Sequence, residues 1–264
     1  MRAVQVVRVF TRGTEGGNHL GVVNDVVGLD DELMQGIATD LGFSETVYVD
    51  WADPSAVPYL RIFTPGSELP FAGHPLVGTA WIMSELGPVA GSTLECGIGE
   101  VEYRREEDLV WVDVPFRIDV APEDDTADVV LRCGLPDPER TWCLLLPKEY
   151  LIAEYPDADT IAALNPDVEA MGDRFGLYVF ARDADRVRAR FFAPTAGVPE
   201  DPATGSAAIA LAYALSIAGE ARGALEIEQG EEIGHPSLIR LQWDELRASI
   251  GGTVVRDDLL VIEE

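Results

Sequence analysis

Side chains that can exchange protons stand at two similar turns of the chain. His74 lies in Glu68–Ala80, "ELPFAGHPLVGTA", and Asp201 and Ser206 lie in Glu200–Ala212, "EDPATGSAAIALA". Both turns precede an apolar stretch that predicts a helix. A histidine exchanges protons near neutral pH, and a carboxylate whose pKa is raised by burial can act as a base. These residue types indicate acid–base chemistry.

Two further polar residues lie in apolar surroundings. Glu45, in "FSETVYVD", opens a predicted strand, and Asn18 lies in "GGNHLGVV", a tight turn that leads into a strand. Glu45 is either a desolvated carboxylate or an ordinary surface or helix-end glutamate. Asn18 is either a ligand donor or a turn residue in the left-handed conformation, and its local sequence favours the turn.

Glycines stand at the start of both predicted helices, Gly73 in the first and Gly205 in the second. The first backbone N–H groups of a helix lack internal partners and carry partial positive charge, which suits anions. If the two helix starts converge on one cleft, they form a pocket for a carboxylate. Alternatively, the small residues only permit tight turns between strand and helix.

The surrounding elements repeat as well. Arg61-Ile-Phe-Thr-Pro65 matches Arg190-Phe-Phe-Ala-Pro194, and Glu68-x-Pro-x-x-Gly73 matches Glu200-x-Pro-x-x-Gly205, with three extra residues in the second copy. A long apolar helix follows each copy. The pattern predicts an internal duplication into residues 1–117 and 118–264, with a last strand that can cross to the first half.

The remaining pattern favours an α+β fold rich in strands. Alternating segments predict strands at both ends of the chain and around residues 92–115, 139–147 and 174–183. Helices are predicted at Asp30–Phe43, from the Gly-His-Pro turn to near Gly87, at Asp157–Asn165 and after Gly205.

Composition excludes several classes of protein. The 264 residues include 47 acidic and 19 basic ones, for a formal net charge of −28, and Lys148 is the single lysine. No basic patch for nucleic acid is visible, and no apolar run reaches the roughly 18 residues of a membrane span. We expect a cytoplasmic protein with an acidic surface typical of halophiles. The three cysteines and three histidines show no metal-ligand spacing, so no metal site is expected.

Four segments together resemble the PhzF-like isomerases of phenazine biosynthesis. They are "VFTRGTEGGNHLGVV", "FSETVYV", "RIFTPGSELPFAGHPLVGTA" and "RFFAPTAGVPEDPATGSAAIALA", and their order and spacing agree along the whole chain. The resemblance implies a diaminopimelate epimerase-like fold. In that fold two pseudo-symmetric domains each wrap a curved, mostly antiparallel sheet or barrel around a central helix, with the active site between them.

The same resemblance implies a cofactor-free isomerase that moves a proton within a small carboxylic acid similar to dihydro-hydroxyanthranilate. Glu45 would shuttle the proton, and His74 and Asp201 would be its polar companions. The substrate-binding residues would be Asn18, Gly73, Gly205 and Ser206. It also implies a homodimer.

Two departures from related proteins limit what the resemblance implies. Racemases and epimerases of this fold use one cysteine at each helix start, and neither turn here has one. His19 replaces the proline that usually follows the asparagine, so the pocket rim and the natural substrate stay open. A non-catalytic small-molecule binder and a thiol-independent epimerase or racemase remain as alternatives.

Overall fold

The computed structural model describes residues 1–51, 53, 56–86, 92–116, 119–121 and 123–262. In these ranges eighteen strands join into one continuous, mostly antiparallel sheet. Their bounds are β1 (Arg2–Thr11), β2 (Asn18–Val23), β3 (Glu45–Val49), β4 (Leu60–Phe63), β5 (Glu68–Leu69), β6 (Thr93–Cys96), β7 (Gly99–Glu106), β8 (Leu109–Pro115), β9 (Asp119–Val120), β10 (Arg140–Leu146), β11 (Lys148–Tyr155), β12 (Gly176–Asp183), β13 (Arg186–Ala193), β14 (Val198–Asp201), β15 (Gly223–Gln229), β16 (Ser237–Trp243), β17 (Arg247–Arg256) and β18 (Leu260–Ile262).

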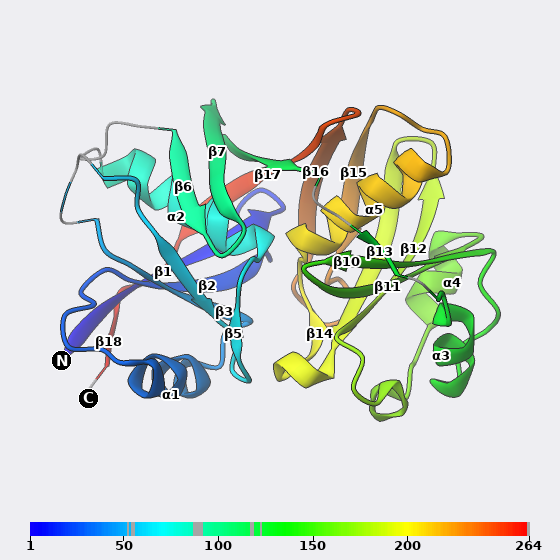
Figure 1. Ribbon diagram of the computed structural model, residues 1–264, viewed down its shortest axis with the longest axis horizontal. Coiled ribbons are helices and arrows are strands. Elements are labelled where there is room, and N and C mark those ends of the chain that lie inside the picture. Colours follow the sequence, from blue (N-terminus) through cyan, green and yellow to red (C-terminus); the bar gives the residue numbers. More distant parts are fainter. Residues whose placement is uncertain (52, 54–55, 87–91, 117–118, 122, 263–264) are drawn as a thin grey trace.

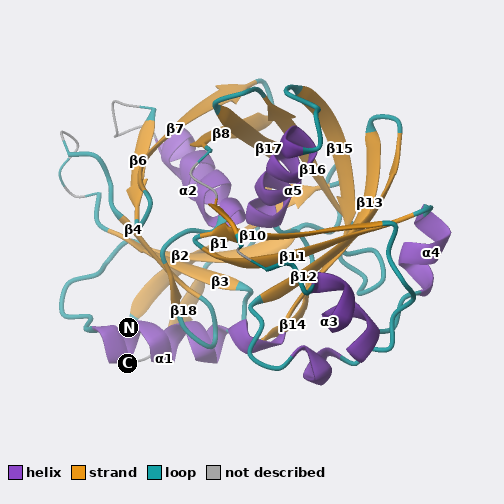
Figure 2. Ribbon diagram, turned by 45° about the vertical axis from the view of Figure 1, so that its right-hand side comes forward, coloured by secondary structure: helices purple, strands orange, loops and turns teal. Residues whose placement is uncertain are grey.

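Two apolar helices are enclosed by the curved sheet. The helices are α1 (Asp31–Leu41), α2 (Gly73–Leu86), α3 (Thr126–Arg132), α4 (Ala158–Ala163) and α5 (Gly205–Ile217), with 3₁₀ turns at Val168–Met171 and Pro194–Ala196. Figures 1 and 2 show α2 and α5 between strands, α2 in the half that holds the N-terminus and α5 in the other. Both helices are apolar on every face because strands cover them on several sides.

Strand β17 joins the two halves of the sheet. It pairs with β8 along one edge and with β16 and then β1 along the other, and β18 also pairs with β1. The predicted boundary between residues 117 and 118 lies outside the described residues, so the division into two domains stays a prediction. No helix within the described ranges is both long and apolar enough to cross a bilayer.

Local sequence explains the ends of the first helix. The Asp30 side chain accepts a hydrogen bond from the Leu33 N–H at 2.9 Å, and Gly42 ends α1 in the left-handed conformation with φ 64°. Among the elements that the sequence analysis missed are α3 and β11. Helix α3 follows an acidic, Pro-containing segment, and β11 follows β10 directly after Pro147, so the periodicity of each was too short to stand out.

The duplicated motif forms the same contact in both halves. Arg61 donates from Nε and Nη2 to the two carboxylate oxygens of Glu68 at 2.7 Å, and Arg190 does the same to Glu200 at 2.8 Å. Each guanidinium also lies 5.0 Å from the centre of the ring two residues later, Phe63 or Phe192. The repeat therefore encodes a strand pair locked by a bidentate ion pair.

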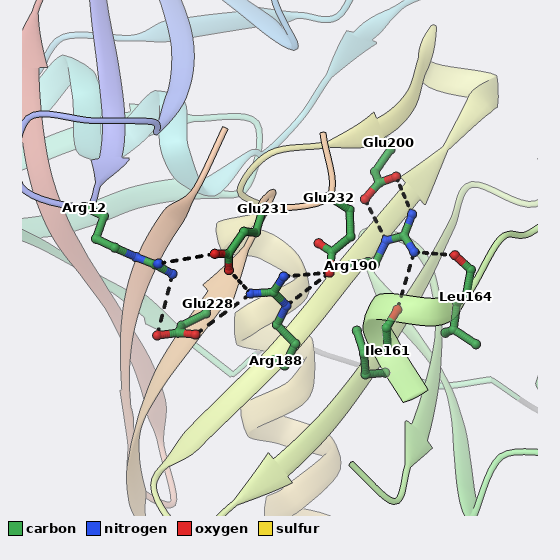
Figure 3. Close-up of polar contacts among 9 residues, drawn as sticks. All are labelled: Arg12, Ile161, Leu164, Arg188, Arg190, Glu200, Glu228, Glu231 and Glu232. Atoms are coloured by element: carbon green, nitrogen blue, oxygen red, sulfur yellow. Dashed lines mark hydrogen bonds and ion pairs between the residues drawn. The ribbon is translucent and has the colours of Figure 1, made fainter. Parts of the chain in front are cut away.

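The second copy is the more deeply buried. Arg190 has a side-chain exposure of 8%, against 27% for Arg61, and it also donates to the carbonyl oxygens of Ile161 and Leu164. Figure 3 shows Arg190 between these carbonyls and Glu200, beside a chain of ion pairs that runs from Arg188 through glutamates to Arg12. Burial makes the Arg190 contact the costlier one to break.

We predict unequal losses of stability when the two arginines are removed. Arg190→Ala leaves Glu200 and two carbonyls buried without a partner and lowers the free energy of unfolding by about 3–5 kcal/mol. Arg61→Ala costs at most about 1 kcal/mol because its pair is partly exposed. Urea unfolding at one fixed KCl concentration measures both. Equal losses would contradict the burial argument.

Candidate active site

The two enclosed helices begin at the same point. A Cβ atom on Gly73 would lie 2.7 Å from the Cα of Gly205, and one on Gly205 would lie 3.0 Å from the Cα of Gly73. The first distance is shorter than real Cβ atoms show to backbone, so position 73 requires glycine, and at position 205 a Cβ would also crowd Cδ1 of Ile250 at 2.7 Å. The unpaired N–H groups of α2 and α5 are brought together, as the repeat predicts.

A small, partly open cavity lies beside these helix starts. Its polar side chains include Glu45 from β3, Asp201 from β14, and Thr204 and Ser206 at the start of α5. Its aromatic lining consists of the rings of Tyr150, Phe175 and Phe191. The structure therefore brings residues from both halves of the chain to one hollow.

His74 and Asn18 stand behind the cavity wall and link its two acids. The Nδ1 atom of His74 lies 3.3 Å from Oε2 of Glu45 and 3.4 Å from Nδ2 of Asn18. Asn18 donates to Oδ1 of Asp201 at 2.8 Å and to the carbonyl of Ala203 at 3.1 Å. Both protons of the Asn18 amide are thus used, which leaves the His74 lone pair to Glu45.

The predicted turn conformation of Asn18 is wrong. Asn18 opens β2, and the positive φ angles belong to Gly16 and Gly17, at 61° and 83°. Those two glycines make the turn, so Asn18 is free to point inward as a donor. His19, the next residue, points to the other face, where its ring stacks on Phe43 and Nε2 lies 3.4 Å from Asp257.

Burial changes the protonation of all three ionisable groups. It raises the pKa of Glu45 well above its usual value, and the nearby charge of Asp201 raises it further. It raises the pKa of Asp201 to about 6, against the opposing effect of hydrogen bonds from Thr204, Ser44 and Asn18. Burial also lowers the pKa of His74 to about 3.

These shifts leave one proton to be shared in the cavity. At neutral pH the His74 ring is neutral, and two adjacent desolvated carboxyls cannot both be ionised at low cost. Oε2 of Glu45 and Nε2 of His74 have no hydrogen-bond partner among the described residues. A proton on Glu45 can be donated to Nδ1 of His74. The site therefore holds an acid and a base a short distance apart.

Three contributors were missed by the sequence analysis. Thr204 donates to Oδ2 of Asp201 at 2.5 Å, and the buried Gln229 amide donates to the Asp201 carbonyl at 2.7 Å and to Thr204 Oγ1 at 3.0 Å. Tyr150 donates to Ser206 Oγ at 2.8 Å. Thr204 lies inside the quoted turn and could have been singled out. Tyr150 is on the missed strand, and Gln229 has no local signal.

Thiols take no part in this arrangement. Cys96, Cys133 and Cys143 are free and buried, and desolvation raises the pKa of each. None lines the cavity. Among the described residues no group of three or more His, Cys, Asp or Glu side chains is arranged to hold a metal ion.

Comparison with known proteins places this fold and site in context. A family model described as phenazine biosynthesis-like protein matches residues 7–256. A trans-2,3-dihydro-3-hydroxyanthranilate isomerase of Pseudomonas fluorescens is 34% identical, over 89% of this chain and 87% of that protein. An uncharacterized isomerase of Pasteurella multocida is 33% identical, over 96% and 91%.

A solved structure confirms the predicted fold. The crystal structure of the PhzF-family phenazine biosynthesis protein of Bacillus anthracis has a TM-score of 0.79 to this chain, at 23% identity, and covers 99% of both chains. The α+β, diaminopimelate epimerase-like architecture that the family resemblance implied is therefore present.

We predict that His74 weakens the protein in acid. The pKa of His74 is about 3 in the folded protein and near 6.5 in the unfolded chain. The neutral ring therefore contributes stability above pH 6.5, and this contribution is lost as the pH falls from 6.5 toward 3. Between pH 7 and pH 4.5 the wild type should lose about 2–3 kcal/mol more than His74→Gln. Urea unfolding of both proteins at the two pH values tests this. Parallel losses would show that the ring is not held neutral.

Proposed function

Since the chain belongs to the phenazine biosynthesis-like (PhzF) family and is an isomerase, we propose that it moves a proton within a small unsaturated carboxylic acid, without a cofactor. The observation that carries the proposal is the buried carboxyl pair Glu45 and Asp201 in a cavity that is also lined by aromatic and aliphatic side chains. A buried carboxyl with a raised pKa can remove a proton from one carbon and return it to another.

The proposed reaction begins with Glu45 as a carboxylate. It removes a proton from a carbon of the substrate, and the electron pair left behind moves through the double bonds toward the substrate carboxylate. The protonated Glu45 then returns the proton at another carbon, so no atom is gained or lost. The helix starts at Gly73 and Gly205 and the Ser206 hydroxyl would offset the charge on the carboxylate.

Two features of the cavity support a ring-shaped substrate. The aromatic rings of Tyr150, Phe175 and Phe191 lie 5.5–6.4 Å from one another and form a broad apolar wall. Glu45 and Asp201 supply the acidic part of the lining. A flat ring with one acidic edge fits this lining. Trans-2,3-dihydro-3-hydroxyanthranilate, the compound in the name of a relative, is the first candidate.

His74 and Asn18 act as positioning residues in this proposal. His74 offers its lone pair to the protonated Glu45, and Asn18 holds the Asp201 carboxylate toward the cavity. Neither lines the cavity, so Asn18, expected to bind substrate, is assigned an indirect role. The homodimer and the cytoplasmic location stay predictions.

Glu45→Gln should abolish the reaction while keeping the shape of the cavity. We expect the entry of solvent deuterium into trans-2,3-dihydro-3-hydroxyanthranilate, followed by NMR in D₂O, to fall by roughly 10²–10⁴-fold. Glu102→Gln, an exposed change on β7, is the matched control and should leave the rate unchanged. Undiminished exchange in Glu45→Gln would exclude this residue as the base.

The same assay separates the alternatives. A non-catalytic binder would hold the acid in the wild-type cavity without deuterium entering it. A thiol-independent epimerase would exchange one proton with inversion at that carbon and leave the double bonds in place. Only an isomerase moves the proton and the double bonds together.

Asp201→Asn should move the pH dependence of the reaction. The base must lose its proton, so kcat/KM is expected to rise with pH through the raised pKa of Glu45. The charge of Asp201 helps to hold that pKa up, so its removal should shift the rise to lower pH. A pH profile of kcat/KM measures the shift. A rise that stays in place or moves upward would rule out this coupling.

A further inference from the structure

A second hollow adjoins the reaction cavity and shares Phe175 and Ala196 with it. Beyond these two residues its charged lining consists of Arg132, Lys148, Glu149, Asp173 and Arg174. We refer to this hollow as the outer groove. A ligand that fills the cavity can extend into the outer groove past Phe175.

Lys148 is linked to the cavity by a row of contacts. It is two residues before Tyr150 on β11, so both side chains leave the same face of the strand. Its Nζ lies 5.9 Å from the centre of the Phe175 ring, which lies 5.5 Å from the Tyr150 ring. The Tyr150 hydroxyl in turn meets Ser206. These contacts run from Ser206, at the start of α5, outward to the ammonium group of Lys148.

The outer groove is positive in a strongly negative chain. Its side chains carry three positive and two negative charges, whereas the formal net charge of the chain is −28. Arg174 is occupied, since it donates to Glu149 at 2.6 Å and also pairs with Asp125. Lys148 and Arg132 have no carboxylate within 4.0 Å among the described residues, although acids outnumber bases 47 to 19.

An arginine at position 148 would tend to form a forked pair with a neighbouring carboxylate, as Arg61 and Arg190 do. A lysine carries a compact charge that stays available to a ligand. The single lysine of the chain therefore lies where an anionic group that extends out of the cavity would contact it.

We propose that Lys148 and Arg132 bind a second acidic group of the substrate, so that the enzyme prefers ring dicarboxylates to ring monocarboxylates. The proposal rests on the proposed function in one respect, the placement of the first carboxylate at the helix starts beside Ser206. The second carboxylate, across the ring, then lies past Phe175 in the outer groove.

The single lysine makes the test direct. Reductive ¹³C-methylation keeps the ammonium charge and gives one lysine signal besides the N-terminal amine. The Glu45→Gln protein, which lacks the proposed base, is titrated with benzene-1,4-dicarboxylate, benzoate or sulfate at constant ionic strength. The dicarboxylate should shift the Lys148 signal to saturation and bind about tenfold more tightly than benzoate. Benzoate should bind without a comparable shift.

Variants show whether the charge is responsible. By calorimetry, Lys148→Gln should lose the preference for the dicarboxylate, and Arg132→Gln and Lys148→Arg should each weaken it, the latter because an arginine would pair with a neighbouring carboxylate. Arg186→Gln removes a cation outside the outer groove, and the preference should stay unchanged. Ser206→Ala should weaken both ring acids to a similar extent.

Three results would overturn the subsite: equal affinity for the two ring acids, no binding of either, or an equal shift of the Lys148 signal by sulfate. Binding to Glu45→Gln does not depend on turnover. If Lys148 selects the dicarboxylate but the wild type exchanges no deuterium, the subsite stands and the proposed function fails. If deuterium exchange occurs but Lys148 does not distinguish the dicarboxylate from benzoate, only the subsite fails.

Discussion

The backbones of Gly73 and Gly205 touch, and no side chain fits between them. Ile250 of β17 closes one side of this contact, since its Cδ1 would lie 2.7 Å from a Cβ on either glycine. The contact fixes where both enclosed helices begin. It also influences which residues meet, because Asp201, Thr204 and Ser206 lie within a few positions of the start of α5 and Glu45 lies on β3, which packs against α2.

The acids of this protein act in two different settings. Most are at the surface, where water and salt screen them and their exact positions matter little. Glu45 and Asp201 have no such screening, and burial gives each of them a pKa shift that an exposed carboxyl does not have. The same chain therefore tolerates dozens of carboxylates outside and gains its chemistry from two inside.

Much of the fold was readable from the sequence because the motif occurs twice. The Arg, Phe and Pro positions of each copy and the helix that follows predicted the strand–turn–helix units that are observed, and Gly73 and Gly205 fell at the right places. The sequence did not show that the two copies of the motif have different roles at the site. Ile62 pairs with Leu69 in the first half, and the matching pair in the second is Phe191 with Asp201. Only the folded chain shows that Asp201 faces the cavity.

Other parts of the site depend on contacts between distant segments. Asn18 and Asp201 are 183 residues apart, and Tyr150 and Ser206 are 56 apart, so no local pattern reports either pair. Gln229 is fully buried at the end of a strand, and its three hydrogen bonds to Asp201 and Thr204 exist only after β15 has paired. The identity of Glu45 as a desolvated acid likewise follows from packing.

The course of β17 has a consequence for how the chain is made. Residues 109–115 pair with residues 247–253, so the sheet around α2 lacks one of its strands until nearly the whole chain has been synthesised. At about 5–20 residues per second, the first half emerges from the ribosome and waits on the order of ten seconds for its partner strand. During that interval the edge of β8 is open. Acidic side chains on β7 and β8, among them Glu102, Glu106 and Asp113, would discourage neighbouring nascent chains from pairing with it.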